Sequence, residues 1–188
     1  NNKTLYVVVL AISATLFGAM MASSVKYLSD DLHPITICFY RCVMGLILIS
    51  PFMIKNNFQA LKSKNIKLQF SRSMINIVSM ICWFSAIGMM YFEKAAALGF
   101  TTPLFTTILA IILLKEKIRF HRTAALLIGF IGIIVIVRPG YVPLEFGTVL
   151  ILFSAFTFSF VLIIVKKLSA IDSSLTIIFY HLLFSTPV

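Results

Sequence analysis

Long apolar runs are the feature that most constrains this chain. A run of about 20 apolar residues spans a hydrocarbon core roughly 30 Å thick. Six such runs are complete and a seventh begins near the last residue: Leu5–Leu28, Pro34–Ile54, Ser73–Phe92, Ala95–Leu114, Thr123–Val137, Gly147–Val165, and Ser173 onward. With 12% charged and 60% hydrophobic residues, the chain lacks the polar surface of a soluble domain. The sequence therefore predicts an all-α integral membrane protein, a multi-span helical bundle.

The basic residues predict how the chain crosses the membrane. Twelve Lys and Arg residues fall on one side of the membrane and four on the other, the second group being Lys26, Arg41, Lys94 and Arg138. Because positive loops stay in the cytoplasm, we expect a multi-pass protein of the cell (inner) membrane with a cytoplasmic N-terminus. The net charge of +10 forms no stripe with interleaved aromatic residues, so we expect the lipid bilayer as a partner and no nucleic acid.

An internal repeat lies at an offset of 140 residues. Val25–Arg41 aligns without gaps on Val165–His181 and matches at 8 of 17 positions, including polar pairs that apolar bias alone does not explain. Five spans separate the copies, so the second copy enters the membrane from the opposite face, as in an inverted-topology repeat. We therefore expect a first five-helix repeat over residues 1–140 and an incomplete second repeat over residues 141–188, in a chain that is truncated.

One stretch resembles a known family in the order of its features. Ala95–Ile118 has a small-residue entry, a Pro-Leu-Phe sequence, an apolar run and a terminal Glu116. It is similar to the EamA-type drug/metabolite transporter family, and the segments Phe39–Arg41 and Gly129–Pro139 agree with this resemblance. The resemblance covers about residues 8–188, or about two-thirds of a family member, and implies ten spans as two inverted five-helix repeats. Lys115 departs from the family pattern, in which Gly commonly precedes this Glu.

Arg41 is the first candidate for substrate binding. It lies seven residues into its span, roughly 10 Å from the end of the helix. A guanidinium at that depth suits the carboxylate of a metabolite, which it can bind through two parallel hydrogen bonds. The alternative is that Arg41 extends to the lipid headgroups or pairs with Asp30 or Asp31. In the second copy of the repeat, His181 takes the place of Arg41.

The third span carries a polar and aromatic face. Asn76, Ser79 and Trp83 are three and four residues apart and so share one side of the helix. Trp83 is the only Trp of the chain and lies at mid-span, away from the membrane interface. This face fits the wall of a substrate pocket. It also fits hydrogen-bonded packing against another helix.

The fourth span carries Thr102, Pro103 and Thr106. Proline removes a backbone donor, so a bend at Pro103 is expected and could serve as a gate. The alternative is a static kink held by threonine hydroxyls. We predict that five residues line one water-accessible volume near the membrane midplane: Asn76, Ser79, Trp83, Thr102 and Thr106. Together with Arg41, which could reach the edge of this volume, they are the predicted substrate-binding residues.

These features together favour a secondary transporter for a small metabolite. No Asp or Glu lies in the middle of a predicted span, which disfavours an antiporter for cations. No spacing typical of metal ligands, cofactor binding or a catalytic set is present, so we expect neither enzyme activity, nor a metal, nor a cofactor. The substrate would carry a carboxylate, and the resemblance implies an amino acid or a derivative such as S-adenosylmethionine. A membrane-embedded lipid-modifying enzyme and a non-transporting membrane scaffold are the alternatives, and a homo-oligomer is left open.

Overall fold

The computed structural model describes residues 2–29, 31–55, 63–115, 120–137 and 145–186. Eight helices occupy this part of the chain: α1 (Asn2–Leu28), α2 (Pro34–Lys55), α3 (Ile66–Met89), α4 (Phe92–Gly99), α5 (Thr102–Leu114), α6 (Phe120–Val137), α7 (Phe146–Leu168) and α8 (Ser174–Ser185). The prediction of an all-α membrane bundle is confirmed. Residues 56–62, which follow the second span, lie outside the described residues, as do three residues named above: Asp30, Glu116 and Arg138.

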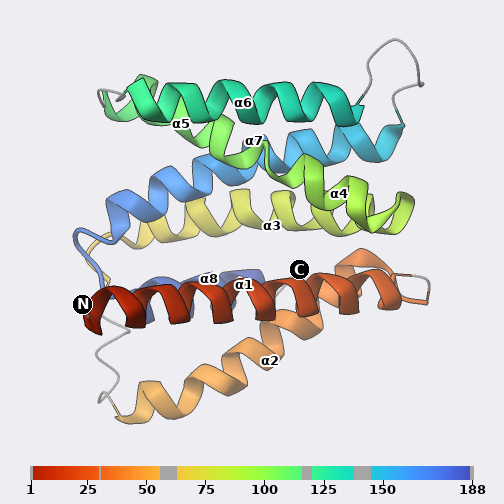
Figure 1. Cartoon of the computed structure of the whole chain (residues 1–188). Coiled ribbons are helices and arrows are strands. Elements are labelled where there is room, and N and C mark those ends of the chain that lie inside the picture. Colours follow the sequence, from red (N-terminus) through yellow and green to blue (C-terminus); the bar gives the residue numbers. More distant parts are fainter. Residues whose placement is uncertain (1, 30, 56–62, 116–119, 138–144, 187–188) are drawn as a thin grey trace.

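The helices run side by side, with successive long helices reversing direction (Figure 1). Five of them are long and apolar enough to cross a membrane when α4 and α5 are counted as the single span Phe92–Leu114. Leu126–Val135 within α6 and the helix α8 are shorter apolar segments. The observed helices therefore follow the expected spans, with the seventh beginning in α8.

The centre of the bundle is the contact between α3 and α7, which is the most extensive helix pair in the described part of the chain. Two buried serines cross-link it. Ser79 Oγ donates to the Ser154 carbonyl at 2.9 Å, and Ser154 Oγ donates to the Ser79 carbonyl at 2.8 Å. Small hydroxyl side chains let two helices approach closely in lipid and bond across the interface. This pair therefore fixes the position of α3 along the axis of α7.

The start of α3 differs from the sequence prediction. We expected the third span to begin at Ser73, but α3 begins at Ile66. Asn65 caps the helix, since its Oδ1 accepts a hydrogen bond from the Leu68 amide at 3.1 Å. The added turns bring Arg72 into the helix, where the prediction had placed it in a cytoplasmic loop.

The fourth span is broken at Phe100 and Thr101, between α4 and α5. The Phe100 and Thr101 amides bond three residues back, to the carbonyls of Ala97 and Leu98. Pro103 lies in the first turn of α5, where a missing backbone donor costs little. The expected bend is therefore a break between two helices, which starts before the proline.

The two ends of the bundle are held by different polar contacts. At one end, Lys26 Nζ donates to the Ile87 carbonyl at the end of α3 at 2.9 Å. At the other end, Asp172, between α7 and α8, accepts hydrogen bonds from the hydroxyl of Ser63, the amide of Lys64 and the side-chain amide of Gln69. Asp172 therefore joins the α7–α8 turn to the segment that begins α3.

Lys115 ends α5 in the left-handed conformation, with φ 52° and ψ 35°. It is the only non-glycine residue with positive φ in the described part of the chain. Glycine adopts this conformation without steric cost, whereas other residues pay for it. The geometry therefore explains why a glycine is common in the family at this position and shows that lysine makes the same turn.

Candidate functional site

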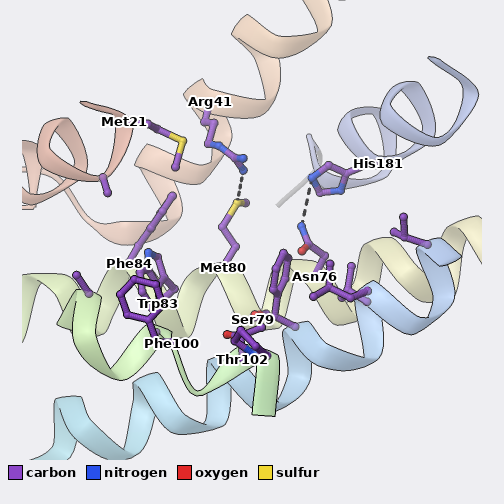
Figure 2. Close-up of a pocket in the computed structure, with 18 of the residues that line it drawn as sticks. Met21, Arg41, Asn76, Ser79, Met80, Trp83, Phe84, Phe100, Thr102 and His181 are labelled. Atoms are coloured by element: carbon purple, nitrogen blue, oxygen red, sulfur yellow. Dashed lines mark hydrogen bonds between the residues drawn. The ribbon is translucent and has the colours of Figure 1, made fainter. Parts of the chain in front are cut away.

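A cavity of about 910 Å³ lies between the helices at the centre of the bundle. Its wall is built from α1, α2, α3, α4, α5, α7 and α8 together with Phe100. Figure 2 shows the lining side chains converging on it from these elements. The cavity brings together five residues predicted to bind substrate: Arg41, Asn76, Ser79, Trp83 and Thr102. The proposed gating residue Pro103 also lines it.

Arg41 extends from α2 toward α3. Its Nη1 lies 2.7 Å from Sδ of Met80, another lining residue (Figure 2). A thioether is a weak acceptor and carries no charge to neutralise the guanidinium. The one ion pair among the described residues joins Lys94 to Glu145 at 3.1 Å, so the described structure gives Arg41 no carboxylate partner. Its charge is available to a ligand in the cavity.

Asn76 connects α3 with α8. Its Nδ2 lies 3.2 Å from Nε2 of His181 (Figure 2). On the other side of the ring, Nδ1 of His181 lies 3.2 Å from Oγ of Ser185. An amide that donates to Nε2 and an imidazole that donates from Nδ1 to the serine satisfy both contacts. This arrangement fits a neutral imidazole. His181, which occupies the position of Arg41 in the second copy of the repeat, thus lines the same cavity.

Trp83 forms an aromatic part of the wall and packs on Gly99 of α4. A Cβ placed on Gly99 would lie 2.7 Å from Cη2 of the indole, so only glycine leaves room for the ring here. Four further aromatic side chains line the cavity: Phe84, Phe92, Phe100 and Phe158. Aromatic faces of this kind bind flat or apolar groups.

Ser79 and Thr106 are placed differently from the other predicted residues. Ser79 borders the cavity, but its hydroxyl bonds to Ser154 of α7, as the packing alternative describes. Thr106 is not among the residues lining the central cavity. It lines a neighbouring cavity of about 460 Å³, and its hydroxyl donates to the Thr102 carbonyl at 2.8 Å. Thr102 and Pro103 line both cavities.

Arg72 lines the central cavity and was missed by sequence reasoning. It is only 8% exposed, and its Nη1 donates to the Ile177 carbonyl of α8 at 3.0 Å. The missed signal was Asn65, a favoured N-cap residue directly before the first residue of α3. A helix started there places Arg72 six residues, or roughly 9 Å, inside the span.

The charges of the wall are of one sign. Arg41 and Arg72 are permanently cationic, and the residues that line the cavity in the described part of the chain include no Asp or Glu. No group of three His, Cys, Asp or Glu in that part could hold a metal ion. The arrangement can bind an anionic group by hydrogen bonds from guanidinium and an attached apolar group by aromatic contact.

A polytopic helical bundle around a polar and aromatic cavity is typical of membrane transport proteins. Comparison with known proteins agrees: residues 5–138 match the EamA-like transporter family, and the chain belongs to it. The S-adenosylmethionine uptake transporter of Rickettsia prowazekii is 28% identical over 163 residues, covering 87% of this chain and 55% of that protein.

Two other relatives have different cargo names. The riboflavin transporter of Vibrio cholerae is 28% identical over 180 residues, covering 94% of this chain and 60% of that protein. The pseudopaline exporter CntI of Pseudomonas aeruginosa is 27% identical over 182 residues, covering 96% of this chain and 64% of that protein. The chain thus spans little more than half the length of the relatives it matches. No solved structure matches it.

Proposed function

We propose that the protein is a secondary transporter that carries a small metabolite with a carboxylate across the inner membrane, and that it is not an enzyme. Transporters of this kind bind their solute between two repeats and expose it alternately to each side. The solute class includes amino acids and S-adenosylmethionine. The names of the relatives, two of them transporters and one an exporter, support the transport role but differ in cargo.

The observation that carries this proposal is the central cavity. It is large enough for a metabolite, lies among apolar spans, and is lined by Arg41, Asn76, Trp83 and Thr102. Charged and polar groups at membrane depth are costly and mark solute pathways. Thr106, in the adjoining cavity, and Ser79, bonded to α7, are assigned supporting positions in the same site, and the break before Pro103 is its proposed gate.

The helix boundaries support the inverted repeat. α1 ends at Leu28 and α7 ends at Leu168, while α2 begins at Pro34 and α8 begins at Ser174. Both pairs are separated by 140 residues, the offset of the sequence repeat. On this basis we assign residues 1–140 to the first repeat and residues 141–188 to the second. The bias of the basic residues supports a cytoplasmic N-terminus.

Transport is tested with the purified protein in liposomes preloaded with unlabelled solute. Labelled amino acids and S-adenosylmethionine are offered outside, and we expect one of them to accumulate by exchange. Arg41→Lys should slow this exchange because an ammonium cannot make two coplanar hydrogen bonds to a carboxylate. Unchanged exchange in both Arg41→Lys and Arg41→Gln would remove Arg41 from the site.

The cavity itself is tested by thiol labelling in a background without Cys38, Cys42 and Cys82. A cysteine at Thr102 should react with a charged, water-soluble thiol reagent and be protected by the transported solute. A cysteine at Ile112, which is 64% exposed on the same helix α5 and outside the cavity, should not react in the bilayer. An inert cysteine at Thr102 together with no exchange of any solute would refute the proposed function.

A further inference from the structure

Arg72 is a buried cation with spare hydrogen-bonding capacity. Its Nη1 bonds to the Ile177 carbonyl, whereas its buried Nε has no hydrogen-bond partner. A guanidinium carries five N–H donors, and leaving one buried and unpaired is costly. Arg72 also lines the central cavity, so a ligand that enters the cavity meets the Arg72 side chain in its wall.

The neighbours of Arg72 are polar and uncharged or weakly basic. Asn76 lies one turn further along the same face of α3, and it contacts His181 of α8. All three line the cavity near the Ile66 end of α3. Neither Asn76 nor His181 neutralises the Arg72 charge, so this end of the cavity favours an anionic group.

The opposite end of the cavity is aromatic. Trp83 lies 11 residues beyond Arg72 on α3, roughly 16 Å along the helix axis. Phe92 and Phe100, from the two ends of α4, also line the cavity. Arg72 therefore lies at one end of the α3 wall and Trp83 at the other, with Arg41 beside Met80 between them.

Resting on the proposed function, we propose that Arg72 binds the anionic end of the transported solute, and that this solute is an amphipathic acid whose flat or apolar part lies against Trp83. A carboxylate can accept two hydrogen bonds from one guanidinium, which makes it a strong partner for Arg72. Arg41, exposed and in contact with Met80, is then the secondary cation of the site.

Because Trp83 is the only Trp of the chain, its fluorescence reports ligand binding in the cavity directly. The probes are 2-naphthoate and its neutral amide, 2-naphthamide, which share one ring system and differ in charge. Energy transfer from Trp83 to the naphthyl ring is measured with the purified full chain in neutral detergent. We expect the acid to bind roughly tenfold or more tightly than the amide, as a charge-assisted hydrogen bond predicts.

Arg72→Gln should remove most of this preference for the acid and leave binding of the amide unchanged. The matched control is Lys67→Gln, which removes the same charge from an exposed position on α3 outside the cavity. It should keep the preference. Arg72→Lys should keep part of the preference for the acid. Folding of each variant is judged by helical circular dichroism, and Arg72→Lys is the test variant if Arg72→Gln does not fold.

The outcomes separate the two proposals. If folded Arg72→Gln keeps the full preference for the acid, the role of Arg72 is overturned. If only Arg72→Lys folds, a full wild-type preference in that variant overturns it. Equal binding of the acid and the amide by the unmodified chain would overturn the anionic substrate class and leave transport intact. Binding of neither probe, with no exchange in liposomes, would refute the cavity as a solute site and the proposed function with it.

Discussion

Asn76 Nδ2 lies 3.2 Å from Nε2 of His181 and thereby joins α3 to α8 across the wall of the central cavity. The two residues are 105 positions apart, and His181 lies in the second copy of the sequence repeat. The contact also places an amide one turn from Arg72 on α3. It is therefore a sensitive position at which to change the charge of the cavity.

We expect Asn76→Asp to abolish the preference of the cavity for an acid. The two side chains have nearly the same shape, but the new carboxylate can pair with Arg72 four residues earlier on the helix. Affinity for 2-naphthoate should fall roughly tenfold, while affinity for 2-naphthamide stays the same. Asn65→Asp makes the same change at the N-cap of α3, where Asp caps as well as Asn, and should leave both affinities unchanged. A retained preference in Asn76→Asp would contradict this prediction.

The Ser79–Ser154 cross-link predicts a coupled loss of stability. Ser79→Ala and Ser154→Ala should each cost about 1 kcal/mol of the free energy of unfolding, because each deletes one interhelical donor. The double variant should cost less than the sum, since the two hydroxyls belong to one network. Thermal unfolding in detergent measures these effects.

Ser13→Ala is the control for the serine pair. Ser13 is half-buried, and its hydroxyl bonds to the Leu10 carbonyl of its own helix. This substitution should change the midpoint of unfolding little. Additive losses at Ser79 and Ser154 would show that the two helices are held in register by other contacts.

Asp172 predicts a dependence of stability on pH. Partial burial raises the pKa of its carboxyl, but hydrogen bonds from the Lys64 amide, Ser63 and Gln69 outweigh this effect and lower the pKa. The folded pKa is thus below that of the unfolded chain, about 3.9 for Asp. The stabilisation is present above the unfolded pKa and is lost as pH falls through the folded pKa.

Asp172→Asn should therefore lower the unfolding midpoint at neutral pH, and the difference from the unmodified protein should shrink below about pH 4. An asparagine amide cannot accept all three hydrogen bonds. Asp31→Asn, at the opposite end of the bundle, makes the same substitution at an exposed carboxylate and serves as the control. A difference that is constant down to the lowest pH would exclude the carboxylate as the cause.

Much of the fold follows from the sequence because apolar run length and basic-residue position are local signals. The ends of α1, α2 and α5 agree with the predicted spans within a few residues. The start of α3 was missed because Lys67, Gln69 and Arg72 make its first turns polar, and the helix is identified there by its Asn65 cap. Local hydropathy carries no information on which polar residues a neighbouring helix will bury.

Part of the lining of the central cavity was predicted from the sequence, but the contacts between its helices were not. Helical spacing identified the face of Asn76, Ser79 and Trp83, and all three line the cavity. The partners of that face, Ser154 and His181, come from helices more than 70 residues away, and spacing within one helix cannot reveal them. The contact between Gly99 and Trp83 likewise joins two helices and is not visible from spacing within either one.

Gly99→Ala tests whether Trp83 is held in place by α4. The new methyl would lie 2.7 Å from the indole, closer than atoms can approach, so the ring must shift toward the cavity. Overpacking of this kind costs about 1–3 kcal/mol. We expect a lower unfolding midpoint, a changed Trp83 emission maximum and weaker binding of both naphthyl probes, because the shifted ring occupies the space of the ligand.

Gly129→Ala, where nothing lies within 4 Å of the added carbon, should alter none of the three. Unchanged emission and binding in Gly99→Ala would show that α4 yields to the indole, and that the aromatic end of the cavity is not fixed by this contact.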